Sequence, residues 1–182
     1  MGESTAHEPV MPILVAFSRH AAAFAWAIEQ VTASWGPLAL ASVPFDFVET
    51  DYYRPTMGPD LRLQLFAFAL RMDAAELVER KLQTKLWEQS YVRLGIHSEP
   101  RPLNLDAGYL TKAKLVLAST KDHAHRLYLG RGVFGEITLV YRDRHWQPHP
   151  WTYPNYRRED YQEFLSRARE QLRQLEREGP AA

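Results

Sequence analysis

The chain has no cysteine among its 182 residues, which excludes several classes of protein at once. Without thiols it has no disulfide framework, no thiolate nucleophile and no thiolate metal site. It also lacks any apolar run near the roughly 20 residues that a membrane-spanning helix needs. Residues 1–10 carry two glutamates and no basic stretch followed by an apolar core, so we expect no signal peptide. These absences favour a cytoplasmic protein that does not enter a membrane.

Two nucleotide-binding motifs are also missing. The chain contains no GxxxxGK[ST] phosphate loop, although Thr120-Lys121-Asp122 superficially resembles the guanine-selecting loop of GTPases. That loop has one residue between the lysine and the aspartate, whereas Lys121 and Asp122 are adjacent. Residues 130–132 (Gly-Arg-Gly) precede an expected strand rather than a helix, so they are no dinucleotide fingerprint. We therefore expect neither GTPase activity nor a dinucleotide site.

The charge is balanced overall but unevenly distributed along the chain. The formal net charge is zero, from 22 Lys and Arg against 22 Asp and Glu. Residues 1–100 carry a net charge of −4, from 8 basic and 12 acidic residues, whereas residues 101–182 carry +4, from 14 and 10. A basic region that also contains aromatic residues attracts anions such as phosphates. The alternative is that this half simply uses arginine as solubilising charge.

The first half predicts a ferredoxin-like order of elements. The expected order is strand, helix, strand, strand, helix, strand, which is the split βαβ arrangement βαββαβ. Pro44 interrupts the second strand, so we expect that strand at an edge or at a bulge. Asp73 and Glu76 form a capping box for the second helix. The expected strands are 11–17, 40–47, 61–70 and 103–105, and the expected helices follow Ser18 up to Trp35 and run from Asp73 to Leu86.

The second half predicts antiparallel strands and a closing amphipathic helix. Residues 115–118, 126–129 and 134–141 are the expected strands, and a hairpin turn joins the last two. The helix is expected to open near Asn155, and its apolar residues recur at helical spacing. We expect one α+β domain over residues 11–178, preceded by a flexible N-terminus at residues 1–10. The apolar positions of the closing helix are Tyr161, Phe164, Leu165, Ala168, Leu172 and Leu175.

The segment after the 115–118 strand carries the densest set of candidate binding groups. A strand end places them in a loop, where binding residues concentrate. Lys121, His125 and Arg126 are expected to contact a phosphate, the arginine in a bidentate manner. Asp122 is expected to orient a histidine for acid–base chemistry. The alternative is a turn in which Asp122 caps backbone donors and the histidines are solvated.

Two further carboxylates are candidates for the same site. Asp106 lies in residues 104–110 (NLDAGYL), before a flexible Ala-Gly that can aim its carboxylate into a cleft. The alternative, which we favour, is a turn with a positive φ at Gly108. Glu136 lies in an apolar strand, where an unpaired carboxylate is costly to bury, so an Arg or Lys partner is expected. His123 and His125 form a weak metal-binding pattern, and we assign no metal ligand from it.

Aromatic residues beside arginine complete the candidate site. Tyr53 and Arg54 lie in one loop, and Trp151, Tyr153 and Tyr156 lie in another. Such residues can stack on bases or sugars, although they more often pack a long loop onto the body of the protein.

Long motifs in the chain resemble an uncharacterised bacterial family, the domain of unknown function DUF4416. The motifs are NLDAGYL, KLVLASTKDHAHRLYL, GVFGEITLVYR and WQPHPWTYPNYR, together with PFDFVETDYYRPTMG earlier in the chain. The resemblance extends roughly from residue 8 to residue 175 and implies no established activity. Some members have been labelled GTP-binding, which the motifs above do not support. The chain departs from the family at Ala107, where a proline is usual, and at Asn155, where an aspartate is usual.

The sequence therefore predicts a cytoplasmic module that binds a phosphate-bearing small molecule or nucleotide in a basic, aromatic-lined cleft. Two alternatives remain open: a metal-dependent or acid–base enzyme that uses the histidine and carboxylate set, and a non-catalytic protein-interaction domain. The expected catalytic residues are Asp106, Asp122, His125 and Glu136, and the expected ligand-binding residues are Tyr53, Arg54, Lys121, Arg126, Trp151, Tyr153 and Tyr156.

Overall fold

The computed structural model describes residue 3 and residues 5–178 of the chain. They form a nine-stranded sheet with helices on both of its faces. The strands are β1 (Met11–Ser18), β2 (Leu38–Ala41), β3 (Phe45–Asp46), β4 (Arg62–Phe68), β5 (Asn104–Leu110), β6 (Lys114–Ser119), β7 (Leu127–Gly130), β8 (Val133–Arg142) and β9 (His145–Pro148). The helices are α1 (Ala21–Trp35), α2 (Arg54–Met57), α3 (Leu77–Arg93) and α4 (Glu159–Glu178), with 3₁₀ turns η1 (Ala74–Glu76) and η2 (Pro154–Arg157).

The sheet is antiparallel throughout, in the order β2-β4-β1-β5-β6-β8-β7, with β3 on β4 and β9 on β8. Its first four strands have the order expected of a βαββαβ unit, in which the first strand lies between the third and the fourth. The strands β6, β8 and β7 then extend the sheet beyond β5. The predicted α+β class, with a ferredoxin-like first half and antiparallel additions, is confirmed.

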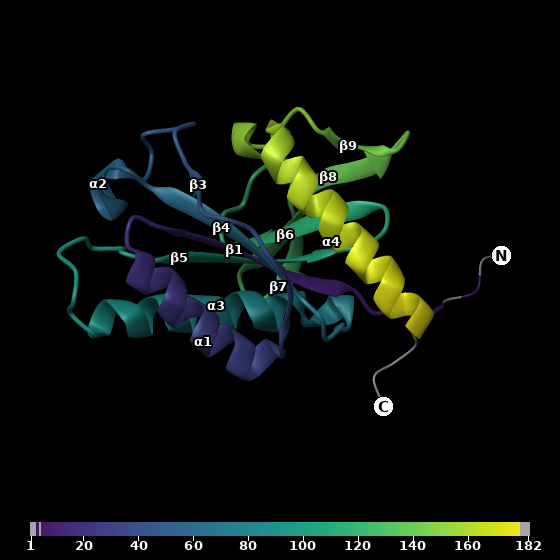
Figure 1. Ribbon diagram of the computed structural model, residues 1–182, viewed down its shortest axis with the longest axis horizontal. Helices are drawn as coiled ribbons and strands as arrows, with labels where there is room; N and C mark the ends of the chain where they lie inside the picture. Colours follow the sequence, from purple (N-terminus) through teal and green to yellow (C-terminus); the bar gives the residue numbers. More distant parts are fainter. Residues whose placement is uncertain (1–2, 4, 179–182) are drawn as a thin grey trace.

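Two hydrophobic layers hold the helices against the sheet. Figure 1 shows α1 and α3 below one face and α4 crossing the other. The alternation of side chains along β1 explains this, because Leu14 and Ala16 face the first layer while Ile13 and Val15 face the second. The buried stripe of α4 is the predicted one: Tyr161, Phe164, Leu165, Ala168 and Leu172.

Several local predictions are confirmed by the backbone. The strand interrupted by Pro44 is divided into β2 and β3, which both pair with β4 at the sheet edge. Gly36 ends α1 with a φ of 89°, a conformation that glycine adopts without strain. Asp73 and Glu76 form the expected capping box in front of α3.

Other local predictions are wrong. Residues 104–110 form the strand β5 rather than a turn, because they pair with β1 along their whole length. Ser18 does not cap α1 directly; its hydroxyl accepts from the backbone of His20, and the helix begins at Ala21. At the other end of the chain, Asn155 lies in η2, and α4 begins four residues later.

The N-terminal segment is only partly described. Of the expected flexible residues 1–10, residues 1, 2 and 4 lie outside the described residues, whereas Val10 is buried and paired with Met72. No helix in the described part of the chain is long and apolar enough to cross a membrane.

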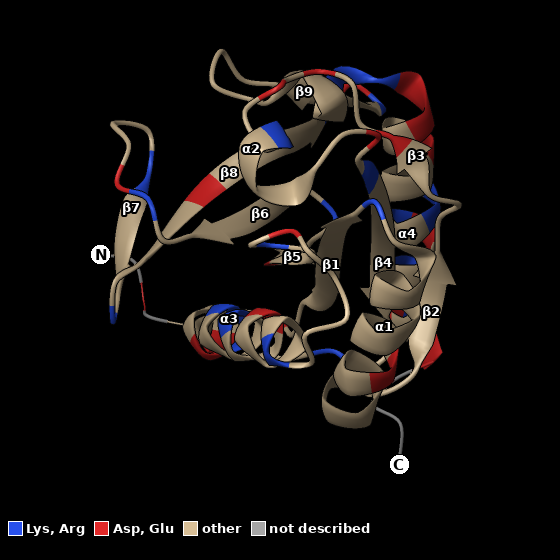
Figure 2. Ribbon diagram, turned by 90° about the vertical axis from the view of Figure 1, so that its left-hand side faces the viewer, with Lys and Arg blue, Asp and Glu red and all other residues tan. Residues whose placement is uncertain are grey.

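The sheet opens between β5 and β6. These strands pair only from Gly108 to Leu110, opposite Leu117 to Leu115, while the earlier half of β5 pairs with β1 alone. Beyond Leu117, β6 continues along β8 instead, up to Ser119. Figure 2 shows β6 and β8 leading away from β1 and β4. Gly108 stands at the point of divergence, where the strands are packed most closely.

We predict that Gly108→Ala destabilises the protein by about 1–3 kcal/mol. An added Cβ at Gly108 would lie 2.5 Å from the carbonyl oxygen of Val116, so the strands must separate at this point. Gly135→Ala is the matched control, because its Cβ would meet only the flexible side chain of Leu129 at 2.9 Å. Urea denaturation measures both free energies of unfolding. Equal losses in the two variants would contradict a close approach confined to Gly108.

Candidate functional site

A hollow occupies the place where β5 and β6 diverge. Its enclosed cavity volume is about 120 Å³, and it widens into open solvent at its mouth. Residues far apart in the sequence meet there, from β5, β6, β8, α3 and the loops near α2 and η2. Seven of the residues predicted for the site line it: Tyr53, Asp106, Lys121, Arg126, Glu136, Tyr153 and Tyr156.

Two side chains of α3 replace the missing strand pairing at Leu105. The backbone N–H of Leu105 donates to Glu88 Oε1 at 2.6 Å, and its carbonyl accepts from Lys81 Nζ at 3.0 Å. Lys81 and Glu88 are two helical turns apart and so share one face of α3. A buried backbone group without a partner is costly, so these two side chains make the divergence of the strands possible.

Asp106 lies at the centre of a polar network on the floor of the hollow. Its Oδ1 lies 2.7 Å from Lys81 Nζ, and its Oδ2 accepts from Asn104 Nδ2 at 3.0 Å. Arg101 donates in turn to the side-chain oxygen of Asn104. Burial opposes ionisation of Asp106, but the Lys81 ammonium and these hydrogen bonds outweigh it and hold the pKa of Asp106 below its ordinary value. Behind the floor, burial raises the pKa of Glu88.

Glu136 and Arg126 form a second, almost fully buried ion pair. Arg126 Nε lies 2.7 Å from Glu136 Oε2, and the two side chains are 5% and 4% exposed. The same guanidinium donates to Ser119 Oγ at 2.8 Å and to the carbonyl of Lys121 at 3.0 Å. His125 Nε2 lies 3.2 Å from the same carboxylate oxygen. The predicted cationic partner of Glu136 is therefore Arg126, which ties β8 to the end of β6.

Aromatic rings form the walls of the hollow. Phe17 packs on Phe47 edge-to-face at 5.2 Å, and Tyr53 lies 5.9 Å from both rings. Burial raises the pKa of Tyr53, and the charge of Asp106 raises it further. Burial also raises the pKa of Tyr156 well above its ordinary value, and Asp106 and Glu136 both add to this shift. Tyr156 therefore remains a neutral phenol within the field of both carboxylates.

One buried polar group in the hollow has no partner. Asn155 is 2% exposed, and its side-chain Nδ2 makes no hydrogen bond among the described residues. Asn155 lines the hollow next to Tyr156, and its unpaired Nδ2 is itself closed to solvent.

The mouth of the hollow is positively biased. Lys121 is exposed, and its Nζ lies 3.0 Å from the Tyr52 hydroxyl and 4.5 Å from the centre of that ring. Through this hydrogen bond Lys121 lowers the pKa of Tyr52. The lining contains four cationic side chains (Lys81, Arg101, Lys121 and Arg126) and two carboxylates (Asp106 and Glu136).

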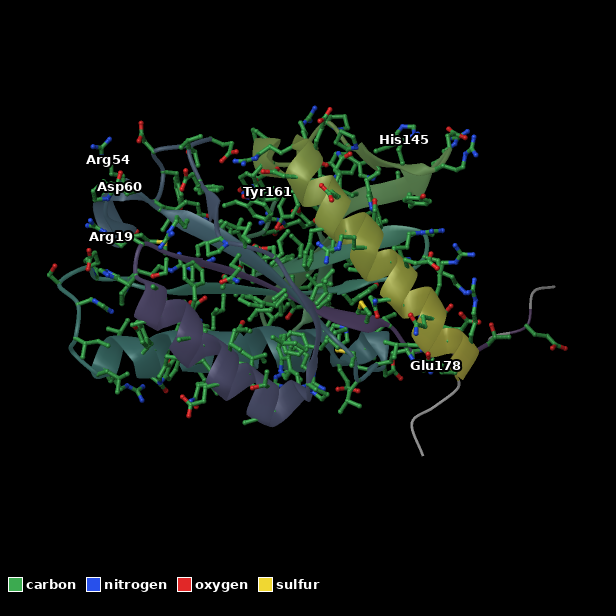
Figure 3. All side chains as sticks on the ribbon, viewed as in Figure 1. Arg19, Arg54, Asp60, His145, Tyr161 and Glu178 are labelled. Carbon is green, nitrogen blue, oxygen red and sulfur yellow. The ribbon has the colours of Figure 1, made fainter. Side chains whose placement is uncertain are left out.

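Four predicted residues lie outside the lining. Arg54 faces a neighbouring hollow that contains Arg19 and Asp60, and Figure 3 shows these three residues at one end of the molecule. Asp122 is exposed.

The other two predicted residues outside the lining stack on each other behind it. The His125 and Trp151 rings are 5.4 Å apart and tilted by 9°. His125 still reaches the site through Glu136, whereas Trp151 donates to the carbonyl of Ile137.

The sequence reading missed the residues contributed by α3. In the sequence, Leu77, Val78, Leu82 and Leu86 indicate an apolar stripe. The first three pack on the core, but Leu86 is 62% exposed. The inward face instead carries polar groups at helical spacing, with opposite charges two turns apart. The helical spacing of these charges is visible in the sequence, but the apolar residues of the same helix indicate a different buried face. The residues of this face are Leu77, Lys81, Thr84, Glu88 and Tyr91.

The predicted histidine pair does not form a three-ligand metal group. The rings of His123 and His125 stack 5.8 Å apart. Within residues 3 and 5–178 the one group of three or more suitable ligands is His20, His97 and Glu99, on the α1 side of the molecule.

Comparisons with known proteins identify a family but no activity. The family model described as Domain of unknown function (DUF4416) matches residues 8–172. No curated protein and no solved structure matches the chain.

We predict that Lys81→Met destabilises the protein by about 1–3 kcal/mol. Methionine keeps the length of the side chain but removes the ammonium, which leaves the Leu105 carbonyl and Asp106 without their donor. The 29% exposure of the Asp106 side chain lets water compensate in part. Lys85→Met, an exposed position one turn further along α3, is the control. Chemical denaturation that shows the same loss in both variants would contradict the role of Lys81.

We also predict that the stabilising effect of Asp106 depends on pH. Because its pKa is depressed in the folded state, its contribution is complete above the ordinary value of about 4 and is lost as the pH falls through the folded pKa. The stability difference between the wild type and Asp106→Asn should therefore be largest near neutral pH and shrink below about pH 4. Urea melts at a series of pH values measure it, and a difference that grows on acidification would contradict the prediction.

Proposed function

Because the chain belongs to DUF4416, a family of unknown function, we propose its function from the hollow itself. We infer that the protein is a cytoplasmic module that binds a phosphate-bearing small molecule or nucleotide between β5, β6 and η2. The observation that carries the proposal is the joint lining of the hollow by cationic side chains, aromatic rings and an unpartnered buried amide.

The cationic groups differ in what they can still bind. Arg126 and Lys81 are committed to buried carboxylates at 2.7 Å, so their main role is to position Glu136 and Asp106. Lys121 and Arg101 have exposed side chains and keep donors for a ligand. We therefore assign the anion contact to Lys121 and Arg101. The sequence had predicted Lys121, His125 and Arg126 for this contact.

The remaining lining groups suit the rest of such a ligand. The hydroxyls of Ser119 and Thr120 lie beside Lys121 at the end of β6, where they can donate to phosphate oxygens. The rings of Tyr53 and Tyr153 offer flat apolar surfaces on which a base or sugar packs. Asn155 Nδ2 supplies a donor for a carbonyl or ring-nitrogen acceptor deeper in the hollow.

A specific observation also favours a second candidate, acid–base catalysis in the same hollow. Asp106, Glu136 and Tyr156 all line the hollow, and burial raises the pKa of Tyr156, so a neutral phenol and two carboxylates share one site. Such a set can hold and donate a proton to a bound substrate. A non-catalytic interaction domain receives less support, because charged, hydroxyl and aromatic side chains converge on one concave site, as is typical of small-ligand binding.

We predict that nucleoside triphosphates or tripolyphosphate stabilise the wild type in a thermal-shift measurement. A ligand at about 100 times its Kd contributes about 2.7 kcal/mol, or roughly 5–10 °C for a chain of this size. Lys121→Ala should lose most of this shift, because it removes a donor without touching either ion pair of the hollow. Arg101→Gln should lose it too, and because Arg101 also contacts Asn104 and Glu88, its shift is measured against its own melting temperature without ligand.

Arg167→Ala is the matched control, since Arg167 is exposed on α4, away from the hollow. Sodium sulfate at equal ionic strength distinguishes a specific site from general anion screening. If tripolyphosphate stabilises the protein and nucleoside triphosphates do not, the site binds phosphate without recognising a base. If only nucleoside triphosphates stabilise it, the site binds nucleotides. Failure of every phosphate compound to stabilise the wild type would overturn the proposal.

A further inference from the structure

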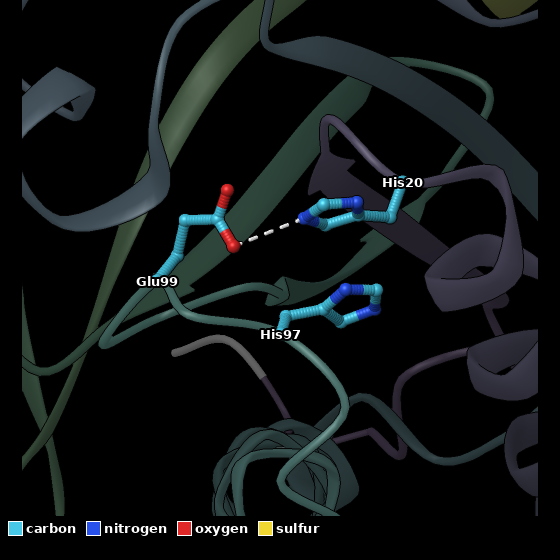
Figure 4. A group of neighbouring side chains, drawn as sticks. All are labelled: His20, His97 and Glu99. Atoms are coloured by element: carbon cyan, nitrogen blue, oxygen red, sulfur yellow. Dashed lines mark hydrogen bonds and ion pairs between the residues drawn. The ribbon is translucent and has the colours of Figure 1, made fainter.

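A compact group of metal-ligating side chains lies away from the hollow's polar network. His20 directly precedes α1, while His97 and Glu99 lie in the connection from α3 to β5. Their ligand atoms all lie within 4.8 Å of one another, and all three residues are partly buried. Figure 4 shows the two imidazole rings stacked one above the other, with the Glu99 carboxylate bonded to the edge of the His20 ring.

One distance within the group matches that between two ligands of one ion. His20 Nε2 lies 3.2 Å from Glu99 Oε2. Zinc binds nitrogen and oxygen at about 2.0–2.2 Å, so two ligands of a tetrahedral ion lie roughly 3.3–3.5 Å apart. The ring of His97 lies 3.6 Å from that of His20, at an angle of 12°. The two rings must turn out of this stack before a nitrogen of each can point at one ion together with the Glu99 carboxylate.

Each ligand also has an outer partner that fixes its orientation. Tyr91 OH lies 2.9 Å from His97 Nε2, which leaves Nδ1 of that ring for an ion. Arg19 holds Oε1 of Glu99 at 3.2 Å and leaves Oε2 facing His20. Ligating histidines commonly use their second nitrogen in this way, and ligating carboxylates are themselves hydrogen-bonded.

We propose that His20, His97 and Glu99 form a binding site for one divalent transition-metal ion of the zinc class. Two imidazoles and one carboxylate are a donor set that suits zinc and similar ions, whereas calcium and magnesium prefer oxygen ligands. Three protein ligands leave a fourth tetrahedral position open to water or to an exogenous group. The site would tie the start of α1 to the α3–β5 connection.

This inference stands apart from the proposed anion-binding function. The three ligands do not line the hollow, although Arg101, two residues after Glu99, does. A bound ion would hold the α3–β5 connection in place and so position Arg101 from outside the hollow. Metal binding can nevertheless be measured without any phosphate ligand, so either proposal can fail without the other.

The test is isothermal titration of the chelator-treated full chain with Zn²⁺, together with Co²⁺ absorption spectroscopy. We expect one ion per chain and the visible bands of a four-coordinate cobalt site. His20→Ala and Glu99→Gln should weaken zinc binding at least tenfold. Tyr91→Phe, which keeps the ring and removes only the outer partner of His97, should weaken it by about tenfold.

Two controls keep the result interpretable. His145→Ala removes an exposed histidine at the β8–β9 turn, and the double variant His123→Ala/His125→Ala removes the histidine pair of the other region. Both should bind zinc as the wild type does. Circular dichroism and melting temperatures in metal-free buffer establish whether each variant is folded. If His20→Ala is unfolded, the zinc affinity of Tyr91→Phe decides the test. Absence of zinc binding by the wild type, or unchanged affinity in folded His20→Ala and Tyr91→Phe, would overturn the proposal.

Discussion

The backbone of Leu105 sets the constraint on which the candidate site depends. A sheet opens only where the exposed strand finds other partners for its N–H and C=O groups, because buried backbone groups without hydrogen bonds are costly. Here Glu88 and Lys81 of α3 supply those partners. β5 can thus leave β6 after three residue pairs, and the hollow forms in the space between them.

The same side chains determine the electrostatics of the hollow. Lys81 also pairs with Asp106 and keeps this carboxylate ionised despite its burial. Arg126 likewise forms an ion pair with Glu136 at 2.7 Å. The two acids are therefore held in place by buried cations, while the cations at the mouth keep donors for a ligand. A chain of zero net charge builds a positively biased site in this way.

The α3–β5 connection links the two proposed sites. It contributes His97 and Glu99 to the candidate metal group and Arg101 to the hollow, and it continues into Asn104 at the start of β5. Its backbone is anchored from both sides, because Arg101 N–H donates to the carbonyl of Thr56 and Ser18 Oγ donates to the carbonyl of Pro102. Both sites thus depend on a segment that the sequence presents only as a linker rich in polar residues.

The sequence by itself determined the order of elements, the edge position of the strand broken by Pro44 and the buried stripe of α4, because these follow from local periodicity and turn chemistry. It also identified Asp106, Arg126, Glu136 and the tyrosines as site candidates. Only the tertiary structure decided which of them meet, since Lys81 and Asp106 pair across 25 residues and His20 and Glu99 across 79. Such partners are chosen by sheet register and helix docking, which no local pattern encodes. For this reason the spacing of Lys81 and Glu88 is visible in the sequence, but their partners on β5 appear only in the folded chain.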